Sequence, residues 1–214
     1  MPDPAADARA VFRAALEAVE PGRLVREALS FEGSGLFCAG RRFPLTASSR
    51  VLVIGAGKAA ASMALAVEEL LGDRISGGVV LAVEGPERPL SHVDCLPCGH
   101  PVPDARSAEG TRQLLKAVSG LSPDDLVIAC WSGGGSACLG LPVDGISTED
   151  LGQVTRLLLA GHFRIQQVNQ VRRVCLQAGD GGVARAAAPA GILALVLCDT
   201  SMADVASGPT LPGA

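Results

Sequence analysis

Two glycine-rich stretches of this sequence carry residue types that could bind phosphate, and a lysine stands in the first of them. Gly55-Ala56-Gly57-Lys58 joins an apolar run at 51–55 to an alanine-rich segment with helical spacing. Glycine permits a tight turn, and a helix that begins there directs unpaired N–H groups and its positive dipole end into that turn. Gly55, Gly57 and Lys58 are therefore candidates for an anion site. On this stretch alone, a dinucleotide site, a phosphate site and a plain turn are comparable alternatives.

The second stretch, Ser132-Gly133-Gly134-Gly135-Ser136, directly follows another apolar run. Three consecutive glycines form a nest of backbone N–H groups, here flanked by two hydroxyls. A dinucleotide fold needs one phosphate-binding turn, whereas two turns and a lysine suit a polyphosphate together with a phosphoryl acceptor. We therefore expect all five of these residues to bind phosphate or nucleotide. The sequence has no GxxxxGK[ST] and no GxSxG, which excludes a P-loop and a serine-elbow hydrolase.

Asn169, Arg172 and Arg173 lie on a segment that we expect to be helical. Asn169 is three residues from Arg172 and four from Arg173, so it shares a helix face with each. An arginine fork suits a carboxylate or a phosphate, which makes Asn169 and Arg172 candidate substrate-binding residues. A solvated helix face is an equally good interpretation of the spacing.

Asp199 ends the last apolar run, where its carboxylate could hold Mg²⁺ near the phosphates. The alternative is a helix cap or a turn residue. The turn Ser207–Thr210 that follows could contribute hydroxyls to the site or only close the loop.

The elements that must position these residues follow from an alternation of apolar runs and helical segments. The runs lack the period of two that a half-exposed strand would show, so both faces of their sheet should be covered. We predict an α/β fold, a doubly wound, Rossmann-like and mostly parallel sheet of five strands, with functional residues at the carboxyl ends of the strands. The expected strands are 51–55, 77–84, a short one within 92–104, 125–131 and 192–199, and the expected helices are 59–71, 107–119, 147–160, 166–178 and 183–188.

The first 49 residues read differently from the rest, and we predict a helical lead-in at 1–49 before the α/β domain at 50–214. Residues 8–29 have the pattern of two amphipathic helices broken at Pro21-Gly22. Residues 30–49 are rich in glycine and serine, and we expect them to be irregular.

The composition of the sequence limits the kinds of partner that we expect for the protein. The net charge is −4, and there are only two lysines, Lys58 and Lys116, with no basic run, so we expect no nucleic-acid partner. No apolar run reaches membrane-spanning length and no signal peptide is evident, which predicts a cytoplasmic protein with no membrane contact. The cysteines, seven in all, lie mostly in apolar contexts typical of reduced thiols. Cys95 and Cys98 form a lone CxxC without a second pair, which favours incidental thiols over a zinc site.

Several stretches together resemble one family. VLVIGAGKAAASMA, the GHPVPD loop at Gly99–Asp104, SGGGSA at Ser132–Ala137, VNQVRR at Val168–Arg173 and CD…ASGPT at Cys198–Thr210 occur in that order. This is the order found in the glycerate 2-kinases that carry a C-terminal MOFRL domain, proteins often mislabelled hydroxypyruvate reductases. The resemblance runs from about Ala8 to the end of the sequence.

The resemblance implies ATP- and Mg²⁺-dependent phosphorylation of D-glycerate, a small-molecule substrate, to 2-phosphoglycerate. Lys58 would be the catalytic cation that neutralises charge on the transferred phosphoryl group, since charge stabilisation and positioning dominate such catalysis. Ser132–Ser136 would cradle phosphate, Asn169 and Arg172 would orient the substrate, and Asp199 would hold the metal.

The sequence also departs from the family. Val174 and Leu176 replace polar positions, and Gly179-Asp180 stands where a lysine and the first of paired glycines are usual. The family continues beyond the position of Ala214 into the MOFRL domain, which closes the cleft and contributes an arginine. A cleft with one wall does not exclude water, so we expect little turnover from this chain alone. A second copy, or a separately encoded C-terminal domain, would have to supply that wall.

Two further interpretations stay open at this point. The first is a non-catalytic homologue that retains a phosphate- or nucleotide-binding cleft. The second is an NAD(P)-dependent oxidoreductase that uses Gly55–Ala60, which fits GxGxxA, with Glu84 as the acid that binds the ribose.

Overall fold

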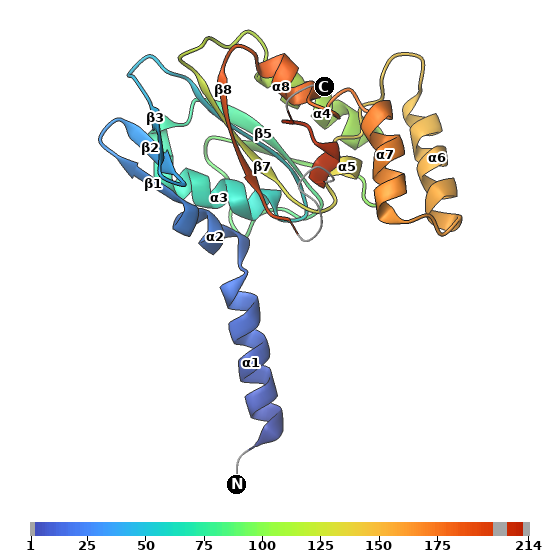
Figure 1. Ribbon diagram of the computed structural model, residues 1–214, viewed down its shortest axis with the longest axis horizontal. Helices are drawn as coiled ribbons and strands as arrows, with labels where there is room; N and C mark the ends of the chain where they lie inside the picture. The colour runs from blue at the N-terminus through green and yellow to red at the C-terminus, as the bar shows by residue number, and fades with distance from the viewer. Residues whose placement is uncertain (1–2, 199–204, 212–214) are drawn as a thin grey trace.

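A parallel sheet forms the centre of the computed structural model, which describes residues 3–198 and 205–211 (Figure 1). Its strands are β4 (Val51–Gly57), β5 (Gly77–Ala82), β6 (Asp94–Pro97), β7 (Leu126–Trp131) and β8 (Gly191–Val196). Their spatial order is β6-β5-β4-β7-β8, and every neighbouring pair is parallel. The five-stranded parallel sheet that the apolar runs predict is therefore confirmed.

The order of the strands places the site. Numbered by their sequence within this sheet, the strands run 3-2-1-4-5 in space, so the direction of winding reverses between β4 and β7. These two strands pair directly, from Val51 opposite Leu126 to Ala56 opposite Trp131. Both are buried along their whole length. The two glycine-rich turns, which follow β4 and β7, therefore emerge side by side at the point where ligands bind in doubly wound sheets.

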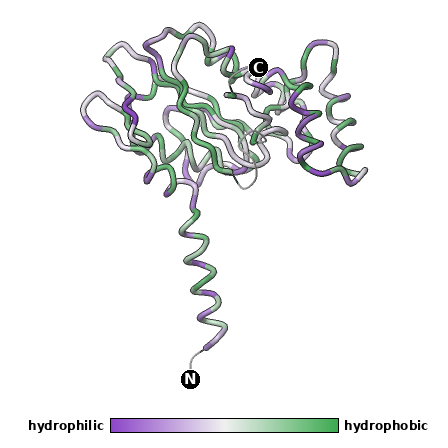
Figure 2. The backbone as a smooth tube through the Cα atoms, in the orientation of Figure 1, coloured by the Kyte–Doolittle hydropathy of each residue, from purple (hydrophilic) through white to green (hydrophobic). Residues whose placement is uncertain are grey.

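Helices cover both faces of the sheet, as predicted. Residues of β4 alternate between two cores: Val51 and Val53 face one, and Leu52 and Ile54 face the other. The first core is completed by α2 (Pro21–Ala28) and α3 (Ala60–Leu71), which is followed by the short helix η1 (Gly72–Arg74). The second is completed by α4 (Ala105–Ala117), α5 (Gly135–Cys138), α8 (Gly182–Ala187) and η2 (Val205–Ser207). The apolar colour of the sheet in Figure 2 follows from this double burial.

The expectation of an irregular stretch over residues 30–49 was wrong. Three short strands, β1 (Leu29–Glu32), β2 (Gly35–Cys38) and β3 (Arg41–Pro44), form an antiparallel sheet of their own. Leu29, Leu36 and Leu45 are buried in the same core as β4 and α3. This small sheet thus packs on the central domain.

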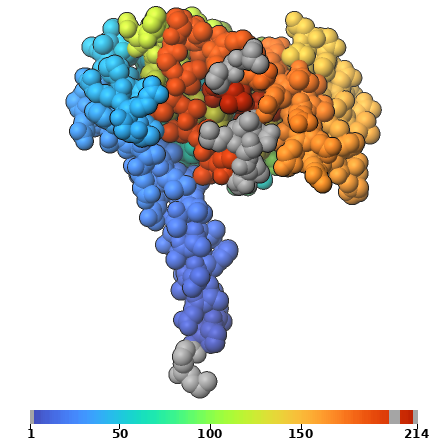
Figure 3. Space-filling model, viewed as in Figure 1, coloured from blue at the N-terminus to red at the C-terminus, as the bar shows by residue number. Residues whose placement is uncertain are grey.

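Two helical units extend from the body (Figures 1 and 3). Helix α1 (Pro4–Ala18) has no buried residue and stands away from the rest of the chain. Helices α6 (Thr148–Ala160) and α7 (Ile165–Cys175) pack on each other and form one edge of the molecule. Helix α6 begins with a capping box, since Ser147 and Asp150 bond reciprocally. In the part of the chain that the structure describes, no helix is long and apolar enough to cross a membrane.

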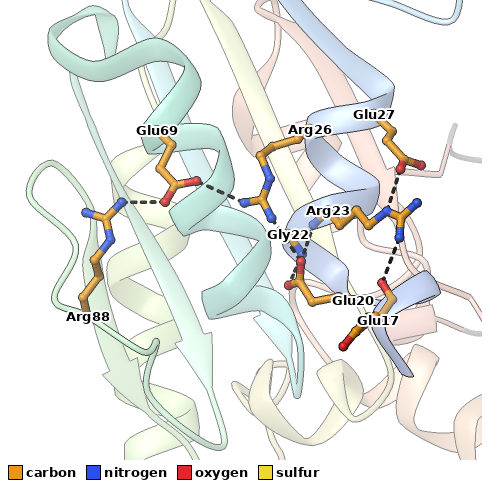
Figure 4. A network of polar contacts seen from close by, with 8 residues as sticks. All are labelled: Glu17, Glu20, Gly22, Arg23, Arg26, Glu27, Glu69 and Arg88. Carbon is orange, nitrogen blue, oxygen red and sulfur yellow. Dashed lines mark hydrogen bonds and ion pairs between the residues drawn. The ribbon is translucent and has the colours of Figure 1, made fainter. Parts of the chain in front are cut away.

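A surface network of ion pairs joins α2 to α3 (Figure 4). Glu69 on α3 pairs with Arg26 of α2 at 3.1 Å and with Arg88 of the loop after β5 at 2.6 Å. Arg26 also pairs with Glu20, whose carboxylate caps the start of α2. Because these groups are largely exposed, the network orients α2 more than it stabilises the fold.

Two buried carboxylates hold loops to the sheet. Glu68 of α3 accepts hydrogen bonds from the backbone N–H groups of residues 91–93. Asp125, which precedes β7, accepts from the backbone and the guanidinium of Arg50 and from the Ser122 N–H. Burial would raise the pKa of Asp125, but the hydrogen bonds from Arg50 and Ser122 outweigh it and hold that pKa well below its usual range.

Candidate active site

The two glycine-rich turns hydrogen-bond to each other at the carboxyl edge of the sheet. The Lys58 N–H donates to the Gly133 carbonyl at 2.9 Å, and the Ser132 N–H donates to the Ala56 carbonyl at 3.2 Å. The Ala59 N–H donates to the Ser132 hydroxyl at 3.0 Å. The second turn therefore fixes the first, and these particular N–H groups are already occupied. The next N–H groups of α3 have no partner within the helix, as at any helix start.

Two glycines at the end of β4 are required by this packing. Gly57 has φ +127°, and a Cβ there would overlap the Ser132 hydroxyl. A Cβ on Gly55 would come within 2.7 Å of the Cys130 carbonyl on β7. A Cβ on Gly135 would likewise come too close to Ala206 of η2. Gly55, Gly57 and Gly135 therefore shape the site without lining it.

A cleft of about 850 Å³ opens over these turns. Of the candidates from the sequence, it brings together Lys58, Ser132, Gly133, Gly134, Ser136, Asn169 and Arg172. The remaining lining residues are Val19, Leu24, Ala59, His100, Pro101, Leu159, Ile165, Gln166, Leu197, Cys198, Val205 and Ala206. The face of α7 that carries Asn169 and Arg172 therefore lines the cleft, and the alternative of a solvated helix face does not hold for these two residues. Asp199, the metal candidate, lies outside the described residues.

Arg172 is the strongest indication of an anionic ligand. Its side chain is 6% exposed, and its Nη2 donates to the Pro101 carbonyl at 2.6 Å. Its Nε is buried without a hydrogen-bond partner, and no carboxylate of the described residues pairs with it. Burial lowers the pKa of Arg172. A buried guanidinium without a counter-charge is costly, and a carboxylate or phosphate in the cleft would offset that cost.

His100 is the site residue that the motif analysis missed. It follows β6 in the GHPVPD loop and lies against Gly134, where a Cβ would come within 3.0 Å of its Nε2. Burial, together with the charges of Lys58 and Arg172, lowers the pKa of His100. Pro101 and Pro103 of its loop were the available signal, because proline restricts the backbone of the residue before it and favours an extended chain.

The hydroxyls near the second turn bond within the protein. Ser132 accepts from Ala59, and Ser136 accepts from the Ser207 hydroxyl at 2.8 Å. The Thr210 hydroxyl accepts from the Trp131 indole N–H at 3.0 Å. The Ser207–Thr210 turn therefore closes its loop over α5 and the end of β7.

The alternative chemistries find less support in the geometry. Among residues 3–198 and 205–211, no group of three His, Cys, Asp or Glu residues could hold a metal ion. Cys95 and Cys98 are free, and the Cys98 thiol contacts that of Cys138. Glu84, the acid that a dinucleotide site would need, is exposed after β5 and does not line the cleft.

Known proteins share this architecture. A D-glycerate 2-kinase from Thermotoga maritima is 35% identical over 206 residues, 94% of this chain and 46% of its own length. A relative from Agrobacterium vitis, 39% identical over 76% of this chain and 38% of its own length, is named as a hydroxypyruvate reductase, and the name itself is provisional. A crystal structure of glycerate kinase from Thermotoga maritima matches with a TM-score of 0.78 and 34% identity, covering 96% of this chain and 47% of that one. The chain spans less than half the length of these relatives.

A family model described as "Domain of unknown function (DUF4147)" matches residues 7–214, nearly the whole chain. The relatives named glycerate kinase align with the same region, which confirms the resemblance to glycerate 2-kinases. The chain belongs to the DUF4147 family, and its fold is that of the matching region of glycerate kinases.

Proposed function

We propose that this chain provides the phosphoryl-transfer cleft of a glycerate 2-kinase, in which ATP phosphorylates the 2-hydroxyl of D-glycerate. The observation that carries the proposal is the convergence of Lys58, the Gly133-Gly134 turn and the buried, partnerless Arg172 Nε in one cleft. Two cations suit a reaction between a polyphosphate and a hydroxy acid, since one can pair with the phosphates and the other with the carboxylate of the acceptor. The names of the relatives support the same reaction class.

The residues of the cleft divide into two groups that suit the two substrates. ATP supplies the phosphoryl group that is transferred, and ADP is the leaving group. The Lys58 ammonium, exposed at the mouth of the turn, neutralises charge on the phosphates, and the backbone of Gly133-Gly134 approaches them closely. Arg172 and Asn169 hold the acceptor carboxylate. Apolar side chains from α2 and α6–α7 line the remainder, which suits the base of a nucleotide.

Mg²⁺ is the part of the proposal that the described residues do not support by themselves. They hold no group of three metal-ligating side chains, and Asp199 lies outside them. Whether turnover requires Mg²⁺ is measured by comparing the assay with Mg²⁺ and the assay with EDTA.

A coupled assay with ATP, D-glycerate and Mg²⁺ tests the proposal. We expect low turnover, because Lys58 is exposed and water has access to the cleft, and we expect Lys58→Ala to reduce kcat at least about 100-fold. Lys116→Ala, which changes the other lysine of the chain, should leave turnover unchanged. A folded protein without turnover would contradict catalysis by this chain alone and would favour the non-catalytic binding module.

A further inference from the structure

His100 lines the cleft together with two cations, Lys58 and Arg172. Its Nε2 and Cδ2 both lie 3.0 Å from the position that a Gly134 Cβ would occupy, and the Lys58 Cγ lies 3.4 Å from the same point. One edge of the imidazole therefore covers the turn proposed to receive the phosphates. The Lys58 side chain approaches the same turn.

The position of Arg172 indicates where the acceptor would lie relative to the imidazole. Its Nη2 bonds the carbonyl of Pro101, the residue after His100, so guanidinium and imidazole reach the cleft from adjoining positions. A carboxylate held by Arg172 would place the substituent on its α-carbon beside the imidazole. In a 2-hydroxy acid, that substituent is the hydroxyl that becomes phosphorylated.

The surroundings of His100 keep it ready to accept a proton. Lys58 faces it from the β4–α3 turn and Arg172 from α7, and both charges disfavour imidazolium. On its own loop, Asp104 is engaged by Arg106 and caps α4. Within the described residues, the imidazole makes no hydrogen bond. No described residue therefore occupies either of its nitrogens by a hydrogen bond, and the residue lines the cleft.

We propose that His100 hydrogen-bonds the 2-hydroxyl of the acceptor and accepts its proton during phosphoryl transfer. As the new bond forms between the acceptor oxygen and the γ-phosphorus, the bond from that phosphorus to the bridging oxygen of ATP breaks. ADP leaves with that oxygen, and the hydroxyl proton passes to an imidazole nitrogen. The assignment rests on the proposed function, because it names the base of the same reaction.

Imidazole ¹⁵N NMR of the full chain tests the contact without requiring turnover. The chain has three histidines, His92, His100 and His162, so single variants assign the signals. Two acceptor analogues separate the hydroxyls: D-lactate keeps the 2-hydroxyl, and 3-hydroxypropionate keeps only the 3-hydroxyl. We expect D-glycerate and D-lactate to shift one His100 nitrogen, whereas 3-hydroxypropionate leaves both nitrogens unchanged. Equal shifts with all three acids, or no shift with any, would overturn the proposal.

Kinetics supply the second arm. Where wild type turns over, His100→Asn should lower kcat about 10²- to 10⁴-fold with KM nearly unchanged, and it should remove the acid limb of the pH–rate profile. His162→Asn, an exposed change at a position with φ +56° that asparagine tolerates, is the matched control. Undiminished kcat in His100→Asn would refute the role of His100 while leaving the kinase intact. If wild type shows no turnover but the expected NMR shifts appear, the proposed kinase activity is refuted, while the contact between His100 and the 2-hydroxyl stands.

Discussion

Asp125 and Arg172 are both buried charges, and the protein treats them in opposite ways. Asp125 is surrounded by donors: the backbone and side chain of Arg50 and the Ser122 N–H all bond its carboxylate. Arg172 donates one hydrogen bond, to the Pro101 carbonyl, and pairs with no carboxylate of the described residues. A buried charge whose partner is supplied by the chain is structural, whereas one whose partner is missing points to a ligand.

Replacing Asp125 by asparagine should destabilise the protein in a pH-dependent way. The folded-state pKa of Asp125 is lowered, so the stabilisation is complete above the unfolded pKa, near 4, and is lost as pH falls through the folded value. At pH 7 we expect a loss of about 2–3 kcal/mol in the free energy of unfolding. Urea denaturation of both proteins between pH 7 and pH 3 should show the difference shrinking toward acid.

The neighbouring Asp124 provides the control for that experiment. It is exposed, and Asp124→Asn should change the free energy of unfolding by less than about 0.5 kcal/mol. A difference between wild type and Asp125→Asn that stays constant over the pH range would contradict the ion-pair explanation.

Residue types in the site were easier to predict than residue roles. The glycines at 55, 57 and 133–135 predicted tight turns at strand ends. Gly133 and Gly134 form such a turn before α5, whereas Gly55 and Gly57 lie within β4, which runs two residues beyond the predicted strand. The sequence could not show that the Ser132 and Ser136 hydroxyls bond within the protein, because their partners, Ala59 and Ser207, are distant in sequence. His100 was missed for the same reason: its neighbours come from other elements.

At the scale of elements, adjacent glutamates on α3 offer a direct comparison of buried and exposed charge. Glu68 is 8% exposed and caps three backbone N–H groups of the loop at 91–93. Glu69 makes the surface ion pairs to Arg26 and Arg88. We expect Glu68→Ala to lower the free energy of unfolding by about 3 kcal/mol and Glu69→Ala by less than about 1 kcal/mol. Chemical denaturation measures both, and equal losses would contradict the distinction.

The hairpins β1–β2 and β2–β3 show why one stretch was misjudged. Each strand has four residues, too few for a clear period of two. The turns held the usable signal. Ala39-Gly40, with φ of 49° and 75°, is a two-residue turn, and Gly33, with φ 59°, begins the other. Glycine at that spacing is typical of tight hairpins as well as of irregular loops.

At the scale of the whole molecule, α1 is the part that the fold does not need. None of its residues is buried, and Val11, Phe12 and Leu16 are each more than half exposed. Deleting residues 1–18 should therefore change the free energy of unfolding by less than about 0.5 kcal/mol. Val25→Ala in α2 removes a buried side chain and should lower it by about 2 kcal/mol. Thermal or urea unfolding compares the two, and a large loss on deletion would show that α1 contributes to the core.

The doubly wound architecture could be predicted because its signal repeats along the chain. Five apolar runs, each ending near glycine or a polar loop and each separated by helical spacing, allow few arrangements other than a covered parallel sheet. The strand order follows less directly. It depends on which helix covers which face, and that is decided by packing between distant segments.

The central claim is that the cleft between the two glycine turns binds ATP through its phosphates. Isothermal titration of ATP with Mg²⁺ into the chain tests it most directly. We predict one ATP per chain and an affinity that falls at least about tenfold in Lys58→Ala, because a charge-assisted contact is lost, with no change in Lys116→Ala. Equal ATP affinity in wild type and Lys58→Ala, or tighter binding of NADPH than of ATP, would contradict the claim.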